Sequence, residues 1–249
     1  MELWLADPEA PGYAALADRC LAPSEEDRAA RFTHARARAV YRGARALLRQ
    51  TLSRYADVPP EAWRFAEGLH GKPAIAAPPA PLAFNVSHTA SLAVVAVCGP
   101  AVPQPPDLGC DVEHTGRRGR LDAIARRFFA PAEVAAWQAL GPEARRDRFF
   151  DLWTLKEAYA KARGLGLHLP TTSYAMDLDT PGEVALRPGP GADEPAPERW
   201  SFVLASAGAD HRLALAVRAP LAAVRARRTR PDGAWSEVAL AVRARRDGC

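Results

Sequence analysis

The sequence predicts an α+β protein, and three observations support this fold class. Two long segments, 24–56 and 143–164, carry apolar residues at helical spacing. Short apolar segments separated by polar turns predict strands of an antiparallel sheet. Two stretches, FNVSHTASLAVVAV at 84–97 and FVLASAGADHRLALAV at 202–217, share a strand–turn–strand pattern. This echo indicates either a duplicated half or ordinary hairpin chemistry.

The first predicted elements follow from helix and turn signals. Ser24 and the acidic residues after it predict a capped helix start, and Pro59 ends the helical pattern. Strands are predicted over 82–86 and 91–98, joined by the polar turn SHTA.

The elements after the proline-rich gap are predicted in the same way. A short strand covers 108–113, and residues 121–140 form two helices with Pro131 in the first turn of the second. Gly164 ends the long helix that follows. The basic segment 219–249 is predicted to be an exposed tail or an edge strand. Four further strands are predicted at 172–178, 182–187, 200–206 and 211–218.

Length and composition are those of an ordinary soluble globular protein. The 249 residues allow one large domain or two of ordinary size, and a hydrophobic content of 48% is enough for a full core. The net charge of +4 permits an acidic partner without identifying one, since an arginine-rich composition accounts for it equally well.

Cysteine use and the N-terminal pattern predict a cytoplasmic location. The four cysteines are scattered, with no CxxC or Cys/His ligand spacing, which indicates reduced thiols. The N-terminus lacks the basic and apolar regions of a signal peptide. No apolar run reaches the roughly 18 residues of a membrane span.

Three carboxylates are predicted to meet if one helix packs on one strand. Asp111 and Glu113 point to the same side of their strand, and Trp153, Glu157 and Lys161 form one stripe of the long helix. If this stripe faces the strand, the three carboxylates repel one another unless a cation lies among them. Oxygen ligands of this kind suit Mg²⁺, with phosphates completing the shell. The alternative is a solvated strand face beside an exposed Glu–Lys pair.

The few lysines indicate candidate phosphate contacts. Of the 33 lysines and arginines only Lys72, Lys156 and Lys161 are lysine, and a compact ammonium suits a single phosphate oxygen. Lys72 follows a glycine turn, where backbone N–H groups lie close to an incoming anion. Ser87 and His88 offer a hydroxyl and an imidazole nearby. The alternatives are a plain polar turn and an exposed Lys156.

Five ordered motifs resemble the phosphopantetheinyl transferases, specifically the larger surfactin-type (Sfp-like) class. They are GKP at 71–73, FNVSH at 84–88, GCDVE at 109–113, RFF at 127–129 and WTLKEAYAKARGLGL at 153–167. The resemblance implies a monomer built as a pseudo-twofold pair of similar α+β halves, each with a small antiparallel sheet and a long helix, and a site between them. The halves would cover 1–105 and 106–249, with their junction at 100–107.

The resemblance also implies an activity. It is the transfer of 4′-phosphopantetheine from coenzyme A to a serine of an apo acyl or peptidyl carrier protein, with release of adenosine 3′,5′-bisphosphate. Mg²⁺ would be the cofactor, with Mn²⁺ as a substitute, and neither nucleic acid nor membrane would be a partner. The pathway of the carrier stays open.

Residue roles carry over from the same resemblance. Asp111, Glu113 and Glu157 would hold the metal, and Glu157 would also be the general base for the carrier serine. Lys161 would contact the α-phosphate and assist the leaving group. The remaining phosphate and nucleotide contacts would come from Ser87, His88 (which also acts in catalysis), Lys72, Arg28, Arg31 and Arg45.

Two other functions fit parts of the sequence. A Mg²⁺-dependent phosphohydrolase would use the same three carboxylates and would need no carrier protein. A basic binding module for nucleic acid or an acidic protein would interleave aromatic with basic residues, but segment 219–249 supplies only Trp235.

Overall fold

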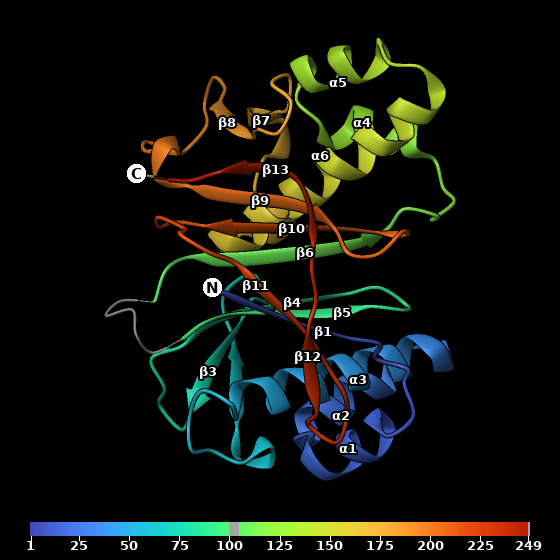
Figure 1. Cartoon of the computed structure of the whole chain (residues 1–249), viewed down its shortest axis with the longest axis vertical. Helices are drawn as coiled ribbons and strands as arrows, with labels where there is room; N and C mark the ends of the chain where they lie inside the picture. Colours follow the sequence, from blue (N-terminus) through green and yellow to red (C-terminus); the bar gives the residue numbers. More distant parts are fainter. Residues whose placement is uncertain (100–104, 249) are drawn as a thin grey trace. The chain divides into compact units, whose positions relative to one another are not determined.

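The computed structural model describes residues 1–99 and 105–248 (Figure 1), with the exception of the Leu167 side chain, and the chain forms two compact units. Unit 1 comprises Met1–Pro106 and Ala223–Ala239, and unit 2 comprises Asp107–Ala222 and Leu240–Cys249. The predicted boundary between the halves, at 105/106, stays a prediction, and most of the predicted junction, namely residues 100–104, lies outside the described residues.

Unit 1 is a five-stranded sheet covered by helices. Its strand order is β12–β11–β1–β5–β4, and β1 pairs parallel with β11, so the sheet is mixed rather than purely antiparallel. Figure 1 shows α1, α2 and α3 on one face of this sheet, where Trp4, Leu47 and Phe84 contribute to a common core. The elements are β1 (Glu2–Ala6), α1 (Tyr13–Cys20), α2 (Pro23–Ala30), α3 (Ala35–Leu52), a 3₁₀ turn (Pro60–Ala62), β2 (Arg64–Glu67), β3 (Pro73–Ala77), β4 (Ala83–His88), β5 (Ala93–Cys98), β11 (Arg225–Thr229) and β12 (Trp235–Glu237).

The single helix predicted over 24–56 is wrong, because the structure has two helices there, α2 and α3. The start signal was also misassigned: Pro23 occupies the first turn, and the Glu25 carboxylate accepts the Ala22 N–H at 3.0 Å. The break after α2 lets this helix fold back on α3, which brings Glu25 to the arginines of α3.

Unit 2 is a four-stranded antiparallel sheet with a long helix against it. The strand order is β13–β9–β10–β6, and α6 packs on β6 and β10. Pro131 begins α5 and Gly164 ends α6 with a φ of 69°, both as predicted. The elements are β6 (Leu108–His114), α4 (Leu121–Phe128), α5 (Pro131–Gln138), α6 (Pro142–Arg163), β7 (Tyr174–Asp177), β8 (Ala185–Pro188), β9 (Ser201–Ser206), β10 (His211–Val217) and β13 (Ala241–Arg246), with short 3₁₀ turns at Gly166–His168, Thr171–Ser173 and Pro197–Arg199.

The predicted α+β class is therefore confirmed, and each unit has its own sheet and long helix. The four C-terminal strands form as predicted, but β7 and β8 make a separate two-stranded sheet. The two halves of the echo are both antiparallel hairpins, β4–β5 and β9–β10. The pseudo-twofold relation of the halves stays a prediction.

The basic C-terminal segment 219–249 is not a solvated tail. Its strand β11 pairs with β1 in unit 1, and β13 forms the edge of the sheet of unit 2 beside β9. The predicted C-terminal half, 106–249, thus lends residues 223–239 to unit 1.

No helix in the described part of the chain combines the length and the apolar character needed to cross a membrane.

A single glycine allows α6 to approach β6 closely. A Cβ atom at Gly109 would lie 2.1 Å from the carbonyl oxygen of Ala158 and 2.4 Å from the amide nitrogen of Ala162. Both are backbone atoms in the last two turns of α6, so they cannot move aside without shifting this end of the helix. The glycine of β6 and the alanines of α6 therefore set the spacing of these two elements.

We predict that Gly109→Ala lowers the free energy of unfolding by about 3 kcal/mol, because the new methyl group must push α6 away from β6. Urea denaturation measures the change. Gly119→Ala is the matched control, since a Cβ atom there meets nothing within 4 Å. Equal stability of the Gly109→Ala variant and the wild type would contradict the close approach.

Candidate functional site

Two hydrogen bonds fix the polar stripe of α6 against β6. The indole Nε1–H of Trp153 donates to Oε1 of Glu113 at 3.0 Å, and Nζ of Lys161 donates to Oδ1 of Asp111 at 2.6 Å. The predicted orientation of the stripe is therefore confirmed, and the alternative of an exposed helix beside a solvated strand face is wrong. Asp111 is buried, with 5% of its surface exposed.

The negative charges of the three carboxylates interact strongly. Burial, followed by the negative charges of Asp111 and Glu113, raises the pKa of Glu157 to about 7, although Lys161 opposes this shift. Burial and the Asp111 charge also raise the pKa of Glu113, against the hydrogen bond from Trp153. The site thus holds more negative charge than its neighbours neutralise.

These carboxylates fit a hard divalent cation by their chemistry. All the donors are oxygen atoms, and their mutual repulsion is the condition that a cation relieves. Within residues 1–99 and 105–248, no three side chains of His, Cys, Asp or Glu are already gathered at the distances of a metal shell. The carboxylates would therefore form part of a shell that other oxygen ligands complete.

Lys156 is neither exposed nor a phosphate contact. It is 2% exposed, and its Nζ lies 2.7 Å from the Glu133 carboxylate and donates to the carbonyl oxygen of Tyr174 at 2.8 Å. The same ammonium lies 4.3 Å from the centre of the Tyr174 ring. This buried ion pair ties α6 to α5 and β7, so lysine persists at 156 for a structural reason.

Unit 1 contains a cavity of about 420 Å³ with a basic lining. Three of the residues predicted to contact phosphates, Arg28, Arg45 and His88, line it together. The other lining residues are Ala22, Ser24, Glu25, Phe32, Tyr41, Ala44, Arg49, Arg64, Phe65, Glu67, Gly71, Pro73 and Val86.

One buried carboxylate, that of Glu25, binds two of the arginines that line this cavity. Glu25 accepts from Arg45 Nε at 2.5 Å and from Arg49 Nε at 2.9 Å, and both guanidinium groups also lie over the Phe65 ring. Burial disfavours the charge of Glu25, but Arg45 and the Ala22 N–H more than compensate and lower its pKa. Four arginines against two glutamates leave this cavity positive, so it suits an anion.

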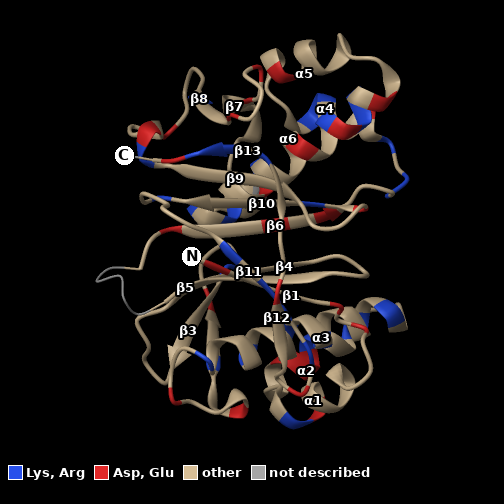
Figure 2. Cartoon of the chain, viewed as in Figure 1, with Lys and Arg blue, Asp and Glu red and all other residues tan. Residues whose placement is uncertain are grey.

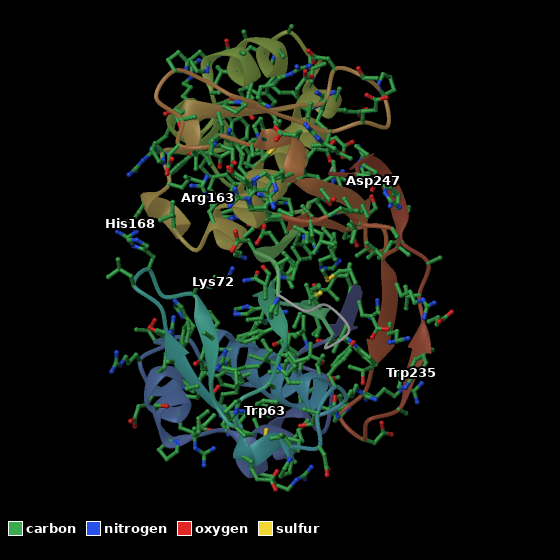
Figure 3. The ribbon with its side chains drawn as sticks, turned by 90° about the vertical axis from the view of Figure 1, so that its left-hand side faces the viewer. Trp63, Lys72, Arg163, His168, Trp235 and Asp247 are labelled. Carbon is green, nitrogen blue, oxygen red and sulfur yellow. The ribbon has the colours of Figure 1, made fainter. Side chains whose placement is uncertain are left out.

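The other predicted residues of unit 1 lie around this cavity. Arg31 is exposed in an adjoining shallow cavity that shares Ser24, Arg28, Phe32 and Glu67 with the first. Lys72, labelled in Figure 3, directly precedes β3 and is not among the lining residues. Ser87 is at the end of β4 rather than in a turn, and strand alternation places its side chain on the face opposite to His88.

Sequence reasoning missed several lining residues, among them Arg49 and Phe65. Arg49 follows Arg45 by four positions and therefore shares its helix face, which was an available signal. No sequence signal predicted that Phe65 lies beside these arginines, because β2 and α3 come together only in the folded chain.

Two models of known protein families match this chain, one in each of its two parts. A model described as "4′-phosphopantetheinyl transferase superfamily" matches residues 107–216, and one described as "4′-phosphopantetheinyl transferase, N-terminal" matches residues 7–99. Together the two matches include β6 and α6 of unit 2 and the arginine-lined cavity of unit 1.

Curated relatives agree with these matches. A 4′-phosphopantetheinyl transferase of Bacillus subtilis is 34% identical over 140 residues, which cover 56% of this chain and 58% of the relative. The 4′-phosphopantetheinyl transferase HetI of Nostoc sp. is 33% identical over 171 residues, covering 68% of this chain and 70% of the relative. The chain thus belongs to the 4′-phosphopantetheinyl transferase family, and the resemblance seen in its motifs is confirmed.

Among solved structures, a holo-(acyl-carrier-protein) synthase from Bacillus anthracis in complex with CoA (3′,5′-ADP) is 20% identical. The match has a TM-score of 0.36 and covers 44% of this chain and 92% of that chain.

We predict that Glu157 makes the metal-free protein less stable as the pH rises from about 4.5 to about 7. In this window the folded state keeps a proton that the unfolded chain, with its ordinary pKa of 4.5, has released. The Glu157→Gln variant lacks this titration. In buffer with chelator, the free energy of unfolding of the wild type should therefore fall relative to that of Glu157→Gln between pH 5 and pH 8. These two pH values lie at about the limits of the window.

Urea denaturation at the two pH values measures this difference. Glu143→Gln, an exposed glutamate on the same helix, is the control and should follow the wild type. Parallel behaviour of the wild type and Glu157→Gln would contradict the raised pKa.

Proposed function

We propose that this chain transfers 4′-phosphopantetheine from coenzyme A to a serine of an apo acyl or peptidyl carrier protein, releasing adenosine 3′,5′-bisphosphate. Membership of the family supports the activity. The observation that carries the site assignment is the pair of bonds from Trp153 and Lys161, which hold the charged stripe of α6 along Asp111 and Glu113.

The reaction is a displacement at phosphorus. The serine Oγ forms a bond to the β-phosphorus of the coenzyme A pyrophosphate, and the bond from that phosphorus to the bridging oxygen breaks. The serine proton goes to Glu157, directly or through a water, and this carboxylate is thereby the general base. The electron pair of the broken bond stays on the α-phosphate of the bisphosphate product.

Lys161 is assigned to the leaving α-phosphate. In the structure its ammonium is bound to Asp111, and burial is outweighed by the surrounding negative charge, which raises the pKa of Lys161 and keeps it cationic. A permanent positive charge at this point stabilises the charge that develops on the bridging oxygen.

Mg²⁺, or Mn²⁺ in its place, would neutralise the pyrophosphate and its developing charge when bound. We assign Asp111, Glu113 and Glu157 to hold it, and the repulsion among their charges supports this assignment, although the three side chains are not gathered at the distances of a metal shell.

The positive cavity of unit 1 is assigned to the nucleotide end of coenzyme A. Arg28 and Arg45 line it with His88, and Arg31 lies in the adjoining cavity, so a 3′-phosphate would find cationic partners there. Lys72 and Ser87 are assigned further phosphate contacts, and His88 a role in catalysis.

Exposed arginines near the carboxylates support an acidic protein as the acceptor. Figure 2 shows basic residues around α4, and the arginines of this group are exposed. Its members are Arg117, Arg118, Arg120, Arg126 and Arg127. Such a surface would steer an acidic carrier protein toward unit 2.

The test is the mass of apo carrier proteins after incubation with the protein, coenzyme A and Mg²⁺. We expect an increase of one phosphopantetheine. Asp111→Ala and Glu157→Ala should each reduce turnover by about 100-fold or more while the variants stay folded, because each removes charge compensation or proton acceptance at the reacting phosphate. Glu143→Ala, on the exposed face of α6, should keep the wild-type rate.

The alternatives predict other products. A phosphohydrolase would release free phosphate or nucleotide without a carrier, and a binding module would change no mass. Full activity of Asp111→Ala or Glu157→Ala would contradict the assigned roles.

A further inference from the structure

One ion pair joins two lining residues of the positive cavity of unit 1. Nη1 of Arg28 in α2 donates to Oε1 of Glu67 in β2, and both residues line this cavity and the shallow cavity beside it. The proposed transfer reaction assigns a phosphate contact to Arg28 but no role to Glu67. An acidic side chain thus lies on a cationic group that is assigned to the ligand.

Glu67 differs from the other carboxylate of the cavity. Glu25 is buried and accepts from Arg45 and Arg49, so it belongs to the structure of the cavity wall. The side chains of Arg28 and Glu67 are 53% and 58% exposed. An exposed ion pair contributes little to stability, because solvent screens it and two long side chains must be ordered to form it. The fold therefore does not depend on the Arg28–Glu67 pair.

The lining arginines differ in how open they are to a ligand. Arg49 is fully buried, and its guanidinium is bound to a carboxylate and to two backbone carbonyl oxygens. Arg45 is 9% exposed, and the exposed Arg64 donates from Nη1 to two further backbone carbonyl oxygens. Arg28 is exposed and is bound to a side chain that can move away. An anion that approaches its guanidinium therefore meets the carboxylate of Glu67.

A phosphate on Arg28 and the carboxylate of Glu67 oppose each other. Both are anions, and two like charges at one guanidinium repel. A phosphate monoester carries about two negative charges near neutral pH, against one for the carboxylate, so the phosphate is the stronger partner of Arg28. Release of Glu67 costs little, because its exposed side chain returns to water. Ligand binding therefore exchanges one ion pair for another.

We propose that Glu67 is an internal competitor for the phosphate that the cavity of unit 1 binds. It occupies Arg28 in the empty protein, leaves when the nucleotide end of coenzyme A binds, and returns when adenosine 3′,5′-bisphosphate departs. Glu67 thereby lowers the affinity for the product and limits product inhibition. This inference rests on the proposed function and involves no covalent step.

Binding of adenosine 3′,5′-bisphosphate to the whole chain tests the proposal, with isothermal titration calorimetry as the measure. Glu67→Gln keeps the size of the side chain and removes its charge. We expect binding to tighten by about twofold to fivefold, the range of an exposed ion pair. The inhibition constant of adenosine 3′,5′-bisphosphate in the transfer reaction should fall by the same factor.

Glu9→Gln is the matched control. Glu9 forms an ion pair with Arg36 in the same unit, and neither residue lines the cavity. This variant changes the net charge as Glu67→Gln does and removes the same kind of pair, so it should bind adenosine 3′,5′-bisphosphate like the wild type.

A double-mutant cycle separates competition at Arg28 from general repulsion. Arg28→Gln should weaken binding, because it removes the cationic partner of the phosphate. In this background there is no ion pair to break, so adding Glu67→Gln should leave the affinity nearly unchanged. An equal gain with and without Arg28 would mean that Glu67 acts by its charge alone, and would overturn the proposal.

Two further results would contradict the competition. They are unchanged or weaker binding in Glu67→Gln, and equal tightening in Glu9→Gln. If the chain binds adenosine 3′,5′-bisphosphate but transfers no phosphopantetheine, the proposed function fails and the calorimetric comparison still decides the role of Glu67. If the wild type does not bind adenosine 3′,5′-bisphosphate at all, the assigned nucleotide site and the competition are both wrong.

Discussion

The close packing of α6 on β6 is the constraint on which the rest of the site depends. Because Gly109 has no side chain, the helix backbone lies directly against the strand. At this spacing Trp153 reaches Glu113 and Lys161 reaches Asp111. The carboxylate of Glu157 is then buried among like charges, which raises its pKa. A cation bound at this position would relieve the repulsion. The close backbone contact thus determines which side chains of the site interact.

The excess charge at the candidate site is positive in unit 1 and negative in unit 2. In unit 1 the single carboxylate of Glu25 is shared by Arg45 and Arg49, and the excess of arginine makes the neighbouring cavity a site for anions. In unit 2 the carboxylates outnumber their cationic partners, and the cluster suits a metal ion. A substrate rich in phosphate, such as coenzyme A, has use for both kinds of site, which is consistent with the proposed transferase activity.

Sequence reasoning succeeded where periodicity decides the outcome. The stripe on α6 and the shared face of Asp111 and Glu113 follow from the helix and strand repeats, and the structure places them together. It failed where distant partners decide. The break between α2 and α3 accompanies the Glu25 ion pairs, the burial of Lys156 depends on Glu133 of another helix, and β11 pairs with a strand at the opposite end of the chain. No local pattern carries that information.

Mn²⁺ binding in the presence of coenzyme A tests the central claim most directly, with the signal of free Mn²⁺ in electron paramagnetic resonance as the measure. The account predicts one bound ion per chain. It also predicts that Asp111→Asn and Glu157→Gln each weaken binding by about tenfold or more, as expected for lost metal contacts. Unchanged Mn²⁺ affinity in both variants would mean that the strand and the helix do not form the metal site.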